Sequence, residues 1–102
     1  MNLRLLVYLL ALGCISYPAT TVLAQDEHEI DSLNQRLTTE ISDRQRVDIY
    51  NRLARIQYTD SLVVATNSEK ALQLAQNIIY PEGISDAYYN LGLSAFYTAD
   101  DQ

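Results

Sequence analysis

The stretch Tyr50-Asn51-Arg52-Leu53-Ala54-Arg55-Ile56-Gln57-Tyr58 returns 38 residues later as Tyr88-Tyr89-Asn90-Leu91-Gly92-Leu93-Ser94-Ala95-Phe96. Both copies follow the pattern Tyr-x-x-Leu-(Ala/Gly)-x-x-x-(Tyr/Phe). At helical spacing this pattern puts an aromatic residue, a leucine, a small residue and a second aromatic residue on one stripe. A period between about 20 and 50 residues is typical of proteins built from stacked repeats. The duplication therefore predicts a scaffold of packed helices, an architecture suited to binding rather than to catalysis.

The apolar residues outside these copies also recur every three or four positions, which predicts an all-α chain. We expect helices over about 30–41, 43–58, 61–78 and 85–97, with Pro81 and Gly83 ending the third. Ser42-Asp43-Arg44-Gln45 has the sequence of a capping box at the start of the second helix. The residues expected in the core are Ile30, Leu33, Leu37, Ile41, Val47, Tyr50, Leu53, Ala54, Tyr58, Val64, Ser68, Ala71, Leu72, Ala75, Ile78, Ala87, Tyr88, Leu91, Gly92 and Ala95.

Gly92 is unusual because it lies inside a predicted helix, where glycine costs up to about 1 kcal/mol relative to alanine. Ala54 occupies the same place in the first copy. We therefore expect another backbone to approach the helix closely at Gly92.

Residues 1–24 have the features of a secretory signal peptide. Arg4 supplies a positive charge, the run from Leu5 to Ile15 is apolar, and small or modest side chains precede a cleavage point after Ala24. The run is shorter than the roughly 20 residues that a membrane span needs. An uncleaved N-terminal anchor is the alternative interpretation. The sequence thus predicts an exported protein, periplasmic or extracellular, which downstream sequence could tether to a membrane.

Cys14 is the only cysteine, and Ala11-Leu12-Gly13-Cys14 is similar to a bacterial lipidation motif. The bulky Leu12 and the apolar residues that continue to Leu23 argue against lipidation, but the alternative stays open. In either case no thiol remains for a disulfide in the body of the exported chain.

Acidic residues dominate the chain, whose formal net charge is −6 over 102 residues. Cleavage after Ala24 removes Arg4 and leaves six basic against thirteen acidic side chains, a charge of −7. Nucleic acid is therefore excluded as an expected partner, because Lys and Arg must neutralise phosphates to give that affinity. Direct contact of the mature segment with an anionic membrane surface is disfavoured for the same reason.

The repeated residues resemble the tetratricopeptide repeat, a helix-turn-helix unit that stacks into a right-handed superhelix. The resemblance covers about residues 44–98 and implies this division: 1–24 signal peptide, 25–42 polar tail and N-terminal capping helix, 43–80 first repeat, and 84–102 first helix of a truncated second repeat. The spacing of 38 residues exceeds the usual 34, and Ser68 stands where an aromatic residue is common. An ordinary helical hairpin is the alternative. The residues that match are Tyr50, Leu53, Ala54, Tyr58, Ala71, Leu72, Ala75, Pro81, Tyr88, Leu91, Gly92 and Phe96.

The resemblance implies a protein–protein interaction scaffold without catalytic activity. The stretch from Ser68 to Gly92 looks like the long repeats of exported bacterial proteins, many of which precede a membrane segment and an output domain. The alternative function is therefore the periplasmic sensor region of a membrane-bound histidine kinase or nucleotide cyclase. A third interpretation is a small free-standing export or assembly adaptor.

Few residues have the chemistry of a catalytic or metal site. His28 is the only histidine and lies in the predicted polar tail, so a nucleophile in the folded part would have no imidazole base. The three glycines, at positions 13, 83 and 92, form no phosphate-binding loop. Asp26, Glu27, His28 and Glu29 are better explained as a solvated charge run than as metal ligands. We expect no enzyme activity and no cofactor.

A binding site is implied by the resemblance, because the first helices of tetratricopeptide arrays line a groove that accepts an extended peptide or a partner helix. Arg55 could pair with a carboxylate, Asn51 could bond a peptide backbone, and Tyr89 offers a flat contact area. The alternative is a set of exposed polar residues without a ligand. The open end of the repeat is a further surface, through which copies of the chain could self-associate. The expected partner-binding residues are Asp48, Asn51, Arg55, Asp86, Tyr89 and Leu93.

Overall fold

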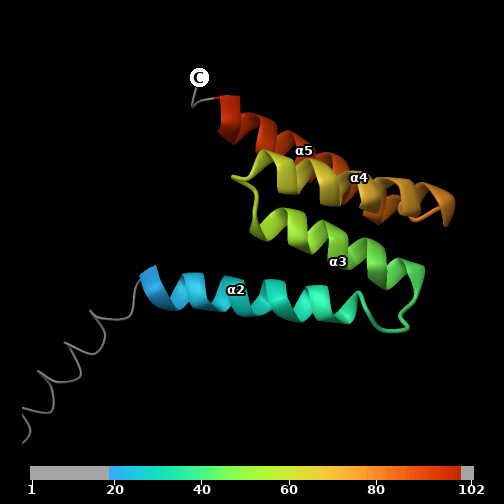
Figure 1. The fold of residues 1–102 in the computed structure, drawn as a ribbon. Coiled ribbons are helices and arrows are strands. Elements are labelled where there is room, and N and C mark those ends of the chain that lie inside the picture. Colours follow the sequence, from blue (N-terminus) through green and yellow to red (C-terminus); the bar gives the residue numbers. More distant parts are fainter. Residues whose placement is uncertain (1–18, 100–102) are drawn as a thin grey trace, which may run out of the picture.

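The computed structural model describes residues 19–99 as four consecutive helices with short connections (Figure 1). No strand occurs in this part of the chain, so the all-α prediction is confirmed. Most of the predicted signal peptide, including Cys14, lies outside the described residues. The helices are α2 (Ala19–Arg36), α3 (Asp43–Ile56), α4 (Ser61–Asn77) and α5 (Pro81–Ala99).

Helix α2 differs from the prediction at both ends. Residues 25–29, expected as a polar tail, are helical, since α2 begins at Ala19. The helix ends at Arg36 rather than near Ile41. Two successive threonines explain this end, because the Oγ1 atoms of Thr38 and Thr39 donate to the carbonyl oxygens three residues earlier, at 2.6 and 2.7 Å. Such local side-chain bonds compete with continuation of a helix.

The start of α3 is the predicted capping box. Ser42 Oγ accepts from the backbone N–H of Gln45 at 3.1 Å, and Gln45 Oε1 accepts from the backbone N–H of Ser42 at 2.9 Å. Asp60 caps α4 in a similar way, with its Oδ1 accepting from the N–H of Val63 at 3.2 Å. Each cap satisfies backbone donors that have no partner within the helix.

The connection between α4 and α5 corrects the predicted boundary. Pro81 does not close the third helix but occupies the first position of α5, where its fixed φ is favourable and its missing N–H is not needed. Ile79, with φ of 54°, has a left-handed conformation after the end of α4, whereas Gly83, which was expected to end that helix, lies inside α5. The fourth helix therefore begins before Ser85.

Helix α3 lies between α2 on one side and the pair α4 and α5 on the other (Figure 1). Successive helices run in opposite directions, so α3 and α5 run the same way, and α4 contacts both. The core follows this arrangement, with mostly branched residues from α3 and mostly alanines from α4 and α5. Its buried apolar residues are Val47, Ile49, Leu53, Ala54, Val64, Ala71, Ala75 and Ala87.

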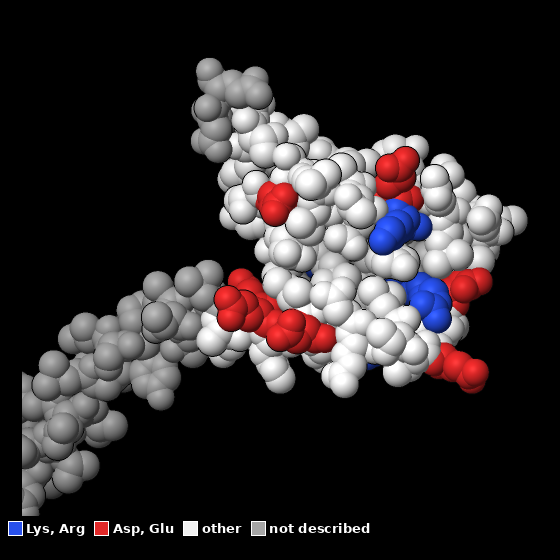
Figure 2. Space-filling model, in the orientation of Figure 1, with Lys and Arg blue, Asp and Glu red and all other residues white. Residues whose placement is uncertain are grey.

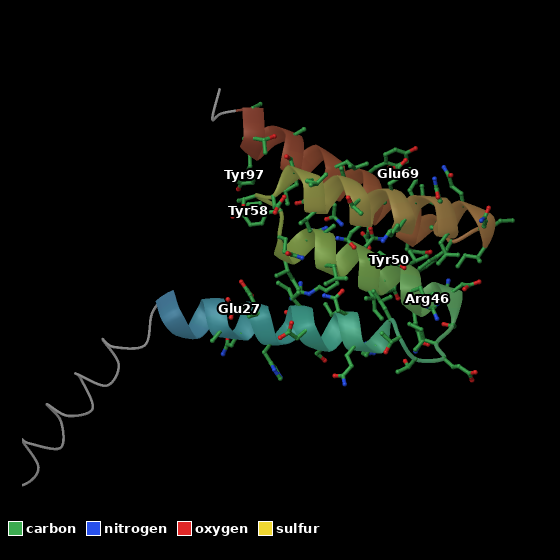
Figure 3. All side chains as sticks on the ribbon, in the orientation of Figure 1. Glu27, Arg46, Tyr50, Tyr58, Glu69 and Tyr97 are labelled. Atoms are coloured by element: carbon green, nitrogen blue, oxygen red, sulfur yellow. The ribbon has the colours of Figure 1, made fainter. Side chains whose placement is uncertain are left out.

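The second copy of the repeated sequence is less buried than predicted. Tyr88 is 56% exposed, and Gly92 and Ala95 are also exposed, because no described helix covers that side of α5. Tyr58 was expected in the core but is 36% exposed at the end of α3. Its ring packs edge-on against Tyr97 with centroids 4.9 Å apart, and this contact joins the ends of α3 and α5 (Figure 3).

The expected close approach occurs at Gly83 and not at Gly92. A Cβ built on Gly83 would lie 2.5 Å from Val47 Cγ1 and 3.2 Å from Ala75 Cβ, whereas one built on Gly92 has nothing within 4 Å. Gly83 therefore marks the place where α5 packs tightly on α3 and α4. The prediction for Gly92 was wrong because it assumed a neighbouring helix that residues 19–99 do not provide.

Candidate partner-binding groove

A polar groove of about 330 Å³ runs between α3 and α5. Four of the six predicted site residues line it: Asp48, Asn51, Arg55 and Asp86. The helices bring them together because α3 and α5 are the two copies of one pattern and run in the same direction. Asp48 and Asp86 are 38 residues apart, so they hold equivalent places in the two copies. Arg52 and Asn90 complete the lining and were not predicted.

Two buried amides form the floor of the groove. Asn51 Nδ2 donates to the carbonyl oxygen of Gly83 at 3.0 Å, and Asn90 Nδ2 donates to the backbone oxygen of Asn51 at 3.0 Å. Asn51 is 5% exposed and Asn90 is 1% exposed. One N–H of the Asn51 amide is therefore used within the protein, where it joins α3 to α5. The predicted bond from Asn51 to a bound peptide backbone stays a prediction.

Arg55 is held in place on two sides. Its Nε donates to Asn90 Oδ1 at 2.6 Å, and its guanidinium lies over the ring of Tyr89, 4.3 Å from the centroid. A cation above a tyrosine face is attracted by the negative charge density of the ring. Within residues 19–99, no carboxylate lies within salt-bridge distance of Arg55. Its terminal nitrogens are thus available to a carboxylate of a partner.

Asp48 and Asp86 have different surroundings at the groove. The phenolic oxygen of Tyr80 donates to Asp48 Oδ1 at 2.8 Å, and this hydrogen bond raises the pKa of Tyr80. The guanidinium of Arg44 lies over the same ring, 4.3 Å from the centroid. Asp86 has no hydrogen-bond or ion-pair partner among the described residues. It is an exposed carboxylate on the first turns of α5.

Arg52 connects the groove to α2. Its Nε and Nη2 donate to the two carboxylate oxygens of Glu29 at 2.7 and 3.1 Å, which lowers the pKa of Glu29 and raises that of Arg52. This is the one salt bridge within residues 19–99. Because both side chains are partly exposed, water screens the pair and its contribution to stability is small.

The other two predicted residues lie beside the groove. Tyr89 is 56% exposed and reaches the site through its contact with Arg55. Leu93 is half-buried one turn further along α5 and does not line the groove.

Asn90 could have been found from the sequence, whereas Arg52 could not. Asn90 falls on the stripe of small buried residues Gly83, Ala87 and Ser94, and a polar amide among them signals a structural hydrogen bond. The pairing of Arg52 depends on the position of α2, for which the sequence holds no signal.

The described residues offer little for metal or membrane chemistry. No group of three or more His, Cys, Asp or Glu side chains within residues 19–99 is placed to hold a metal ion. None of the helices α2 to α5 is long and apolar enough to cross a bilayer. His28 is exposed on α2, away from the groove lining.

Comparisons with protein-family models, curated proteins and solved structures gave no match to this chain.

Proposed function

We propose that this chain is a protein–protein interaction scaffold of the tetratricopeptide type, without catalytic activity, that binds an extended peptide or a partner helix between α3 and α5. The observation that carries the proposal is the groove itself, which is lined by four of the six side chains predicted for partner binding. The succession of antiparallel helices, with α5 packed on both α3 and α4, is also what a repeat of helical hairpins requires.

The charges of the groove define the partner. Among residues 19–99, no cation is bonded to the exposed Asp86, and no carboxylate is bonded to Arg55 on the neighbouring helix. Charged groups held this way favour a ligand that supplies the missing counter-charges. The expected partner therefore carries a Lys or Arg side chain for Asp86 and an Asp, Glu or C-terminal carboxylate for Arg55.

The N-terminal residues support export of this scaffold to the periplasm or cell exterior. Cleavage after Ala24 would retain the residues by which α2 contacts α3, because Glu29 and Leu33 both follow that point.

Selection from a random peptide library tests the proposed function. We expect the selected peptides to combine basic and acidic residues, and we expect Asp86→Asn to weaken their binding about tenfold, which corresponds to about 1.4 kcal/mol. Binding is measured by isothermal titration calorimetry.

Glu69→Gln is the matched control, because Glu69 is an exposed carboxylate on α4 that does not line the groove (Figure 3). Equal losses in the two variants would show that overall charge, and not the groove, governs binding. The proposal would be contradicted if every selected peptide bound the Asp86→Asn variant as tightly as the original chain.

A further inference from the structure

The side of α5 that faces away from the core is uncharged and exposed. This outer α5 face consists of Ser85, Tyr88, Gly92, Ala95 and Phe96, all of them exposed. Tyr88 is 56% exposed and Phe96 is 65% exposed, so two large apolar rings lie in water. The face is distinct from the groove, whose α5 residues are Asp86 and Asn90.

The outer α5 face has a symmetry of its own. Gly92 lies directly opposite the buried stripe of α5, with Tyr88 four residues before it and Phe96 four residues after it. Residues four apart lie above one another on the same side of a helix. The surface at Gly92 therefore has no side chain and is flanked by two aromatic residues at equal distances along the helix axis. Because the two flanks are alike, an antiparallel helix of the same sequence would place an aromatic residue of one copy against an aromatic residue of the other.

We propose that the outer α5 face joins two copies of this chain as a dimer, with the two α5 helices antiparallel and crossing at Gly92. In this arrangement Tyr88 of each copy packs against Phe96 of the other. The absence of a side chain at Gly92 lets the helices approach closely at the crossing. Phe96 is already supported on its own copy by Tyr97, whose ring lies edge-on at 5.4 Å between centroids.

Charge favours this face over the rest of the surface for contact between copies. The chain carries a net charge of −6, so most surfaces would bring carboxylates of two copies together. Residues 87–99 contain no Asp, Glu, Lys or Arg. In Figure 2 the part of α5 next to the grey C-terminal residues is white, whereas acidic side chains gather along α2. Two copies can therefore meet through residues 87–99 without placing carboxylates at the crossing, since Glu82 and Asp86 lie earlier on α5.

The available area sets the strength of the dimer. The exposed parts of Tyr88 and Phe96 amount to roughly 250 Å² on each copy, given ordinary aromatic surface areas. A stable complex buries about 800 Å² per partner. The dimer is therefore weak and forms reversibly as the protein concentration rises.

Sedimentation equilibrium of Gly92→Glu tests the dimer. We expect the dissociation constant to rise at least about tenfold, because two carboxylates would meet at the crossing point. The monomer should melt at the same temperature as the original chain or higher, since glutamate forms helix better than glycine and a Cβ at this position meets no atom within 4 Å. Loss of association is then not a loss of folding.

Gln73→Glu is the matched control, because it adds the same charge at an exposed position of α4. It should leave the dissociation constant unchanged. The proposal is overturned if the original chain stays monomeric at all concentrations, or if Gly92→Glu and Gln73→Glu affect association equally. Association that Gly92→Glu leaves unchanged would also overturn it, because the contact would then lie on another surface.

A disulfide tests the crossing point. A disulfide needs Cα atoms about 4.4–6.8 Å apart, a distance that the two copies of residue 92 can reach only where the helices cross. In a Cys14→Ser background, Gly92→Cys should therefore give a cross-linked dimer under mild oxidation. Gln73→Cys in the same background should give none. Equal cross-linking of the two variants would contradict the arrangement.

Discussion

Gly83 and Gly92 lie on one helix in opposite surroundings. Gly83 is enclosed by Val47, Tyr80 and Ala75, and its carbonyl oxygen accepts from Asn51. Val47 is fully buried and branched at Cβ, so it cannot move away from an added methyl group. Gly92 has open space around it. The same substitution should therefore have opposite effects on stability at the two positions.

We predict that Gly83→Ala lowers the free energy of unfolding by about 1–3 kcal/mol, the usual cost of overpacking a core. Gly92→Ala should raise it by up to about 1 kcal/mol, because alanine favours helix. Urea unfolding followed by circular dichroism measures both. Both variants are measured at a protein concentration at which the chain is monomeric. Destabilisation by Gly92→Ala under those conditions would show that another backbone of the same copy approaches the helix there.

The sequence predicts a close-packed glycine at Gly92, whereas the structure has the close contact at Gly83. Mid-helix glycine is costly, so Gly92 attracts attention, whereas Gly83 follows a proline and looks like part of a turn. The prediction and the structure differ because Pro81 begins α5 instead of ending the preceding helix. Gly83 is therefore part of α5 and lies in its interface with α3.

At the scale of helices, α3 is joined to α5 and to α2 by different kinds of contact. Buried amides and close-packed small residues hold α5 against α3. Arg46 donates to the carbonyl oxygens of Leu37 and Thr39 at 3.0 and 3.2 Å, which fixes the segment after α2 to α3. The middle of α2 is held by the ion pair of Glu29 with Arg52. We expect α2 to be the helix most sensitive to solution conditions.

The ion pair predicts a pH dependence in the acid range. The pKa of Glu29 is lowered in the folded chain, chiefly by its hydrogen bond to Arg52. Its contribution to stability is therefore present above the unfolded pKa, near 4.5, and is lost as the pH falls through the folded pKa. Glu29→Gln should cost less than about 1 kcal/mol at neutral pH, since the pair is exposed.

That difference between Glu29→Gln and the original chain should disappear in acid. Urea unfolding at neutral and at acidic pH measures it. Glu27→Gln, a change at an exposed position of α2 with no bonded partner among the described residues, is the matched control. An effect of Glu29→Gln that persists unchanged in acid would show that the carboxylate charge is not its cause.

At the scale of helices, the sequence predicts the number of helices from their periodicity and the starts of two of them from local signals. The capping box at Ser42 predicted the start of α3, and the predicted start near residue 61 agrees with Ser61, the first residue of α4. Both starts depend on residues close in the chain. The predicted ends of α2 and the predicted start of α5 were wrong. The C-terminal end of α2 depends on threonine side chains that bond to the preceding turn, and the start of α5 depends on a proline that begins a helix.

For the whole molecule, the repeat of the sequence accounts for the groove. Copies of one pattern on α3 and α5, two helices that run in the same direction, bring Asp48, Asn51, Arg55 and Asp86 together. The roles of single residues were less predictable. Asn51 is bonded to Gly83 and Arg55 to Asn90 across the interface, and these pairings follow from packing between helices that are distant in sequence.

The most direct test of the account is a nuclear magnetic resonance titration of the chain with a peptide selected from the random library. We predict that the largest amide shift changes map to the groove, at Asp48, Arg55, Asp86 and Asn90, with little change on the exposed side of α4 around Glu69. Shift changes centred on α4 or on α2, with the groove unaffected, would contradict the claim that α3 and α5 form the binding site.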